Sequence, residues 1–152
     1  MRIPDKIPDN LKKRLLKAVS RVLDTGQFIL DKEVEMLEKE IKDFYKMKYA
    51  VGVNSGTDAL FLSLKALGIK QGDEVITTPF SFIASSEVIA NCGATPVFVD
   101  INYNDFLINV NLIEKEITEK TKAILPVHLF GQACDMKGIM RIARKYKLKV
   151  VE

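Results

Sequence analysis

A short polar stretch between two apolar patterns, Asn54 to Thr57, has residue types that suit ligand binding. The apolar run from Tyr49 to Val53 before it predicts a buried strand, and the leucines at positions 60, 64 and 67 after it predict a helix. Ser55, Gly56 and Thr57 would then form the turn between them. The first backbone N–H groups of a helix have no partner within the helix, and the helix dipole adds partial positive charge there. The turn therefore suits a phosphate or another anion.

An ordinary capped helix after a strand explains the same residues. Serine is among the preferred N-cap residues, so Ser55 needs no ligand to account for its position. Gly56, in contrast, would let a ligand approach the backbone closely, because glycine has no side chain. Both interpretations remain open from these residues alone.

Two more groups with possible binding chemistry follow predicted strands. Phe80 and Phe82 come after a short strand that Pro79 ends, and His128 follows an apolar run at 123–127. Ligands of open parallel sheets bind beyond the carboxyl ends of the strands, so an anion site, an aromatic ring and a histidine at one edge would suit a flat phosphorylated cofactor. The alternatives are that the phenylalanines belong to the core and that the histidine has a structural role.

Apolar periodicity and turn residues predict alternating helices and strands along the chain. Helices are expected near residues 10–26, 31–45, 57–67, 82–90, 110–117 and 135–146, and strands near 49–53, 74–78, 96–99, 123–127 and 148–151. This alternation is typical of an α/β fold with a mostly parallel open sheet and flanking helices. A last apolar strand with no helix after it suggests part of a larger domain.

Composition excludes several classes of protein. The 152 residues are 47% apolar and 28% charged, as in a soluble globular domain, and the net charge of +3 is too small to argue for nucleic acid. Two distant cysteines give neither a disulfide framework nor a metal site. No signal peptide or membrane-spanning run is recognisable, so we expect a cytoplasmic protein without a membrane or nucleic-acid partner. The glycine motifs of dinucleotide, P-loop and serine-hydrolase sites are absent.

Several blocks, taken in order, resemble the amino-terminal part of the DegT/StrS type of fold-type I, pyridoxal-phosphate-dependent sugar aminotransferases. The blocks are Gly26-Gln27-Phe28-Ile29, Asn54-Ser55-Gly56-Thr57-Asp58-Ala59-Leu60, Thr78-Pro79-Phe80-Ser81-Phe82-Ile83-Ala84-Ser85, Gly93-Ala94-Thr95-Pro96-Val97-Phe98-Val99-Asp100, Pro126-Val127-His128-Leu129-Phe130-Gly131-Gln132 and Val150-Val151-Glu152. Each block is weak alone, but the ordered set is specific to this family.

The resemblance implies pyridoxal 5′-phosphate as cofactor and assigns roles to residues already noted. Gly56, Thr57 and the amide of Asp58 are expected to hold the cofactor phosphate, and Phe82 is expected to stack on the pyridine ring. His128 is expected near the cofactor and the substrate. The resemblance also implies a helical segment over residues 1–48. Over residues 49–152 it implies a partial cofactor-binding α/β domain, the incomplete large-domain core of the family.

The implied reaction is transfer of an amino group from an amino-acid donor such as glutamate to a nucleotide-linked keto sugar. The block His-Leu-Phe-Gly-Gln favours relatives that act on 3-keto sugars. In the family an aspartate follows the position of Glu152, and the Schiff-base lysine comes later. We therefore assign no catalytic residue to this chain, expect it to be inactive alone, and expect the full-length protein to be a homodimer. The alternatives are a non-catalytic truncated or regulatory relative, and a small phosphate- or nucleotide-binding α/β protein.

Overall fold

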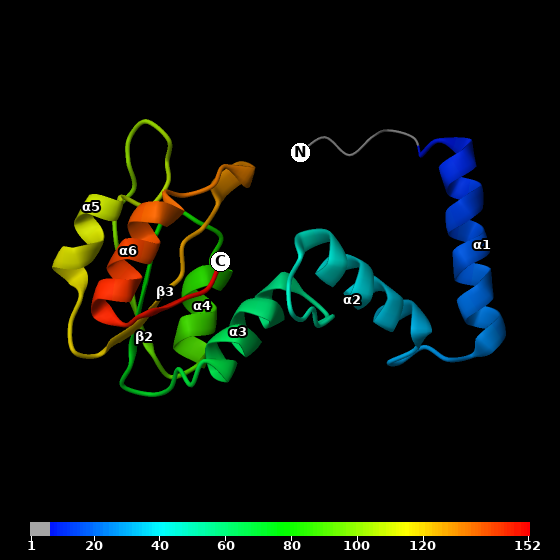
Figure 1. Ribbon diagram of the computed structural model, residues 1–152, viewed down its shortest axis with the longest axis horizontal. Coiled ribbons are helices and arrows are strands. Elements are labelled where there is room, and N and C mark those ends of the chain that lie inside the picture. The colour runs from blue at the N-terminus through cyan, green and yellow to red at the C-terminus, as the bar shows by residue number, and fades with distance from the viewer. Residues whose placement is uncertain (1–6) are drawn as a thin grey trace. The chain divides into compact units, whose positions relative to one another are not determined.

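The computed structural model describes residues 7–152, which divide into two compact units, one ending at Gly52 and one running from Val53 to Glu152 (Figure 1). The predicted domain boundary, between residues 48 and 49, stays a prediction. The second unit contains the sheet and both apolar cores. Among the helices of residues 7–152, none is both long enough and apolar enough to cross a membrane.

The first unit contains two amphipathic helices, α1 (Asp9–Thr25) and α2 (Lys32–Tyr45). Helix α1 ends at Gly26, whose left-handed backbone (φ 65°) is a common helix terminator. Apolar residues recur at helical spacing in both helices, yet neither helix has a buried residue. An ion pair of 2.9 Å joins Arg21 to Glu33, and both side chains are exposed. Exposed pairs of this kind contribute little to stability.

The strand predicted at Tyr49–Val53 is wrong. The segment has no regular secondary structure, and Val51 is 78% exposed. A strand requires a neighbour that accepts and donates its backbone hydrogen bonds, and no strand of the described sheet pairs with these residues. The N–H of Gly52 instead donates to the Glu38 carboxylate at 2.7 Å. An apolar run alone therefore establishes neither burial nor a pairing partner.

Four parallel strands form the sheet of the second unit, in the order β2-β1-β3-β4. Their bounds are β1 Glu74–Thr77, β2 Thr95–Phe98, β3 Thr121–Ile124 and β4 Lys149–Val150. Each strand lies within or close to a range predicted from its apolar run, and the α/β fold with a parallel sheet is confirmed. Parallel pairing brings the carboxyl ends of the strands to one edge, where ligand sites of open α/β sheets lie.

The helices of this unit are α3 (Gly56–Ala66), α4 (Ala84–Asn91), α5 (Val110–Ile113) and α6 (Met136–Tyr146), with short 3₁₀ turns η1 (Glu114–Glu116) and η2 (Leu129–Gly131). One core contains Val75 of β1 together with buried residues of α3 and α4. The other contains Ile76 of β1 together with buried residues of α5 and α6. Successive residues of β1 therefore serve opposite faces of the sheet, as strand geometry requires.

Helix α4 begins later than predicted. The expected start was Phe82, but the helix runs from Ala84, after a turn in which the N–H of Ser81 donates to the carbonyl of Pro79 at 3.0 Å. Proline at position 79 favours such a turn, because it fixes its own backbone angle and cannot continue the strand. Phe82 consequently lies in the loop between β1 and α4.

Candidate functional site

Helix α3 starts with the capping interaction expected of an ordinary helix. The hydroxyl of Ser55 accepts a hydrogen bond from the N–H of Asp58 at 3.1 Å and lies 3.3 Å from the Asp58 carboxylate, to which it donates. The N–H groups of Gly56 and Thr57 donate to no other group in the described part of the chain. The cap therefore occupies the amide of Asp58 and leaves two amides at the helix start available to a ligand.

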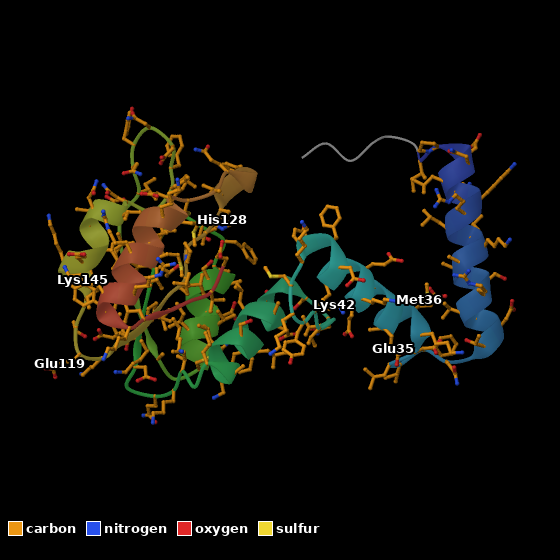
Figure 2. All side chains as sticks on the ribbon, viewed as in Figure 1. Glu35, Met36, Lys42, Glu119, His128 and Lys145 are labelled. Carbon is orange, nitrogen blue, oxygen red and sulfur yellow. The ribbon has the colours of Figure 1, made fainter. Side chains whose placement is uncertain are left out.

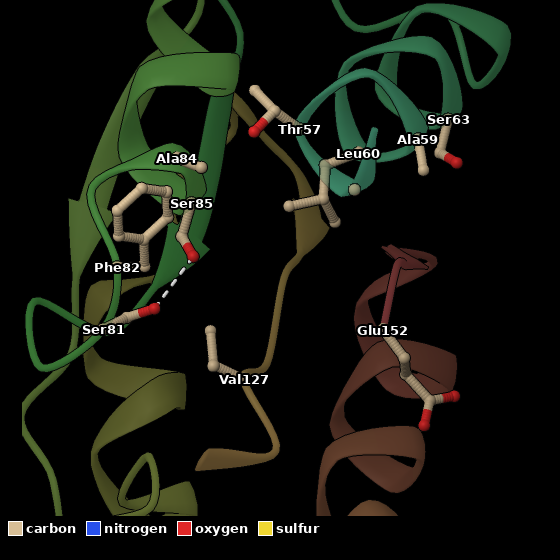
Figure 3. Close-up of a pocket in the computed structure, with 11 residues that line it drawn as sticks. Thr57, Ala59, Leu60, Ser63, Ser81, Phe82, Ala84, Ser85, Val127 and Glu152 are labelled. Atoms are coloured by element: carbon tan, nitrogen blue, oxygen red, sulfur yellow. Dashed lines mark hydrogen bonds between the residues drawn. The ribbon is translucent and has the colours of Figure 1, made fainter. Parts of the chain in front are cut away.

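A cavity of about 600 Å³ opens beside the start of α3 (Figure 3). Its wall combines the first two turns of α3, the loop before α4, the first turn of α4, Val127 after β3 and Glu152 after β4. Of the predicted site residues, Gly56, Thr57 and Phe82 line this cavity. Asp58 and His128 lie outside its wall.

Phe82 is 75% exposed, so the alternative that it belongs to the core is wrong. Phe80 is also partly exposed and packs against the ring of Phe106, with 5.7 Å between the ring centroids. The N–H of Phe80 donates to the Thr78 hydroxyl at 3.3 Å, which helps to fix the loop. An exposed aromatic face at a cavity wall can stack on a flat guest.

Sequence reasoning missed two hydroxyl groups at the same wall. Ser81 and Ser85 both line the cavity, and their Oγ atoms are 3.0 Å apart, a hydrogen bond drawn in Figure 3. Serine is common before and within helix starts, so neither residue carries a signal of its own. Only their spacing of four residues at the predicted start of a helix could have pointed to a contact.

His128, labelled in Figure 2, is held through both ring nitrogens. Its Nδ1 accepts a hydrogen bond from the N–H of Cys134 at 3.1 Å, so in the neutral ring the proton must be on Nε2. Nε2 lies 2.9 Å from the carboxylate of Glu152 and donates to it. His128 therefore reaches the cavity through Glu152, which is part of the wall.

The Cys134 side chain completes this arrangement. Its thiol donates to the carbonyl of Val127 at 3.2 Å. Burial raises the pKa of the Cys134 thiol above its ordinary value of 9.0, and the nearby Asp105 carboxylate acts in the same direction. The thiol is therefore neutral near pH 7, as its role as a donor requires. Cys134 holds the segment after β3 rather than offering a reactive sulfur.

The arrangement can hold an anion and a flat ring together. Two unpaired amides at a helix start favour a negatively charged group. The ring of Phe82 offers a stacking face, and the carboxylate of Glu152 adds an acceptor at another part of the wall.

Comparison with known proteins gives one family. The sequence profile of the DegT/DnrJ/EryC1/StrS aminotransferase family matches residues 9–152. The chain is 45% identical over 142 residues to the UDP-N-acetyl-3-dehydro-alpha-D-glucosamine 3-aminotransferase of Acidithiobacillus ferrooxidans. The matched region covers 93% of this chain and 38% of that protein. It is 43% identical over 144 residues to a pleiotropic regulatory protein of Geobacillus stearothermophilus, with 95% and 39% of the two chains covered.

A solved structure agrees with the fold over almost the whole chain. The crystal structure of NtdA from Bacillus subtilis, which contains the bound cofactor PMP, superposes with a TM-score of 0.91 and 39% identity, covering 98% of this chain and 36% of that one. The chain thus spans 38% of the A. ferrooxidans protein and a similar share of the other two.

Proposed function

Because the chain belongs to the DegT/DnrJ/EryC1/StrS aminotransferase family, we propose that it forms part of the pyridoxal 5′-phosphate site of a sugar aminotransferase. The observation that carries this proposal is that the start of α3 and Phe82 line the same cavity. The bound PMP of the related NtdA structure supports the choice of cofactor. The predicted boundary between residues 48 and 49 would then mark the start of the partial cofactor-binding domain, residues 49–152.

The residues present fit such a group. A methyl group added at Gly56 would meet nothing within 4 Å, so the space beside this glycine is open to a ligand. The amides of Gly56 and Thr57 would donate to the phosphate, and Phe82 would cover the ring face. Asp58 is proposed to contribute only through its position at the helix start, because its own amide, expected to hold the phosphate, donates to Ser55 instead. The bound cofactor would supply an electron-withdrawing ring, which makes amino transfer possible.

His128 is proposed to serve the substrate side of the site. Its contact with Glu152 supports this role, because that carboxylate lines the cavity while the ring stays fixed by the Cys134 amide. In this arrangement His128 orients the carboxylate and holds a proton on Nε2. Replacing His128 with glutamine would keep a donor but lose the ring geometry.

We propose that the complete protein transfers an amino group from an amino-acid donor, such as glutamate, to a nucleotide-linked keto sugar. The name of the A. ferrooxidans relative, a 3-aminotransferase for a UDP-linked 3-dehydro sugar, supports the substrate class. A cytoplasmic location and a homodimer are proposed for the complete protein on the same family resemblance. We further propose that the 152-residue chain alone does not carry the reaction, since it spans only 38% of the length of the A. ferrooxidans relative.

Titration with pyridoxamine 5′-phosphate tests the binding role, because this form of the cofactor needs no covalent bond to lysine. The chain is expected to bind it, and to bind pyridoxamine, which lacks the phosphate, at least about tenfold more weakly, since hydrogen bonds to a charged group contribute about 1.5–3 kcal/mol each. Equal affinity for the two compounds, or no binding of either, would contradict the proposal. After incubation with pyridoxal 5′-phosphate, borohydride reduction and removal of the free cofactor, the chain should carry no stoichiometric pyridoxyl label on a lysine.

A second candidate function is a non-catalytic truncated or regulatory relative; the name of the G. stearothermophilus protein supports a regulatory role. The DNA after the Glu152 codon distinguishes the two. An in-frame aspartate followed later by a lysine supports the aminotransferase, whereas a reading frame without them supports the regulatory protein. Binding of UDP without binding of pyridoxamine phosphate would favour the third alternative, a small nucleotide-binding protein.

A further inference from the structure

Ser85 is the most buried polar residue of the cavity wall. It lies in the first turn of α4, and only 6% of its surface is exposed. A buried hydroxyl requires a hydrogen-bond partner, because leaving one unpaired costs stability. The partner is the hydroxyl of Ser81 at 3.0 Å, in the loop before the helix (Figure 3).

The next residue along the helix makes a different bond. Ser86 donates its hydroxyl to the carbonyl of Ile83 at 3.0 Å, the local backbone contact that serines in helices often make. Ser85 instead bonds to a loop side chain. Its hydroxyl therefore joins α4 to the loop, whereas the hydroxyl of Ser86 only reinforces the helix start.

The bond from Ser85 acts beside the proposed stacking ring. Ser81 immediately precedes Phe82, and the backbone N–H of Ser85 also donates to the carbonyl of Phe82 at 3.2 Å. Because Phe82 is 75% exposed, surrounding side chains do little to fix its ring. The direction of the ring consequently depends on how firmly residues 81 and 82 are held.

We propose that Ser85 is a positioning residue of the site, whose hydrogen bond to Ser81 fixes Phe82 for contact with a flat aromatic guest. This inference rests on the proposed function, since it deepens the role given to Phe82. A ring that is already fixed loses less conformational entropy when it binds. Loss of the hydroxyl pair should therefore weaken binding of the aromatic ring and leave the anion site at Gly56 and Thr57 unchanged.

Three variants and a matched control test the proposal by binding. Ser85→Ala, Ser81→Ala and the double variant should each weaken pyridoxamine 5′-phosphate binding by about three- to tenfold, the effect of one hydrogen bond. The double variant should lose no more than either single one, because all three remove the same bond. Ser86→Ala, on the same helix turn, should leave the affinity unchanged. The affinity for inorganic phosphate should be the same in all four proteins.

A second measurement reports on the ring without any ligand. The chain contains no tryptophan, so Phe82→Trp introduces a single tryptophan at the cavity wall, which can be excited selectively at long wavelength. The fluorescence anisotropy of this tryptophan should fall when Ser85→Ala or Ser81→Ala is added, because the side chain gains freedom. Adding Ser86→Ala should not change it.

The outcomes separate this inference from the proposed function. Unchanged anisotropy and unchanged affinity in Ser85→Ala would overturn the positioning role, and so would additive losses in the double variant. Equal losses of affinity from Ser85→Ala and Ser86→Ala would also overturn it, since they would indicate a general effect on α4. If the unmutated chain fails to bind pyridoxamine phosphate, the proposed function falls, and the anisotropy alone then decides whether Ser85 fixes residue 82.

Discussion

Gly56 is the residue at which folding and binding can be separated. Its backbone does not require glycine, and a methyl group there would meet nothing within 4 Å. Gly56→Ala should therefore leave the free energy of unfolding unchanged or raise it by up to about 1 kcal/mol, since alanine restricts the unfolded chain. The added methyl would occupy the space a phosphate needs, so pyridoxamine phosphate affinity should fall at least about tenfold, as when one hydrogen bond to a charged group is lost.

Gly52→Ala is the matched control for this substitution. A methyl group at Gly52 would make only ordinary contacts of 3.5 and 3.6 Å, and the residue is not part of the cavity wall. Denaturant unfolding and ligand titration of the two variants give the comparison. Full binding by Gly56→Ala would show that no phosphate approaches the backbone there.

The two cysteines provide a prediction about pH. Burial raises the pKa of both thiols above the ordinary value of 9.0, so the folded chain holds them neutral where the unfolded chain has begun to ionise. The stability that they contribute is present below about pH 9 and is lost as the pH rises through the higher folded values. Replacing Cys92 and Cys134 with serine should make unfolding between pH 8 and pH 10 less dependent on pH.

Thiol labelling provides the direct measurement. At pH 8 both cysteines should react with a disulfide reagent at least about 100-fold more slowly in the folded chain than in denaturant, because the reactive form is the exposed thiolate. Fast labelling of Cys134 in the folded chain would contradict both its burial and its hydrogen bond to the Val127 carbonyl.

Individual residues of the site could be predicted to different degrees. Gly56 and Thr57 follow from the apolar patterns on either side of them, and the structure brings both to the cavity wall with Phe82. The contact between His128 and Glu152 joins residues 24 positions apart, and no local pattern encodes such a pair. Ser85 and Ser86 are the same residue type at adjacent positions and differ only in the direction in which each side chain points. That direction depends on the residue at which α4 begins.

At the scale of elements, helix α6 illustrates how one cap depends on a close approach. The Asp135 carboxylate accepts from the N–H of Gly138 at 3.0 Å and so caps the helix start. A methyl group at Gly138 would lie 2.5 Å from this carboxylate and 2.8 Å from Val110 of α5. The glycine therefore allows both the cap and the packing of α5 on α6.

Gly138→Ala should destabilise the chain by about 1–3 kcal/mol, because the cap or the neighbouring helix must move to make room. Lys137→Ala, at the adjacent exposed position of the same helix, serves as control and should change stability by less than about 0.5 kcal/mol. Thermal or urea unfolding of both variants makes the comparison. Equal stability of the two variants would contradict the close approach at Gly138.

Elements were predictable where a local signal was enough. The strands β1, β2 and β3 follow from short apolar runs between turn residues, and α6 follows from its apolar periodicity. Residues 49–53 carry an equally good apolar pattern but have no pairing partner in the described sheet. Strand formation depends on a neighbour that the pattern cannot identify.

At the scale of the whole molecule, every buried residue of the two cores lies between Leu64 and Val151, and neither α1 nor α2 contains a buried residue. The apolar burial that stabilises the fold is therefore concentrated in the second unit. A chain consisting of residues 53–152 should unfold cooperatively, with a midpoint in urea close to that of the 152-residue chain.

Circular dichroism during urea unfolding makes this comparison. The shorter chain should lose helical signal in proportion to the missing helices and keep its single transition. A broad transition without a clear midpoint would contradict the assignment of the stabilising core to the second unit.

The alternation along β1 has a consequence for how this protein can change in length. Val75 and Ile76 face opposite cores, and β1 is hydrogen-bonded to β2 on one side and to β3 on the other. Inserting a single amino acid within β1 would turn every later side chain of the strand to the wrong layer and shift both ladders at once. Insertions and deletions should therefore be tolerated in the connecting loops, whereas the spacing inside this central strand should resist them.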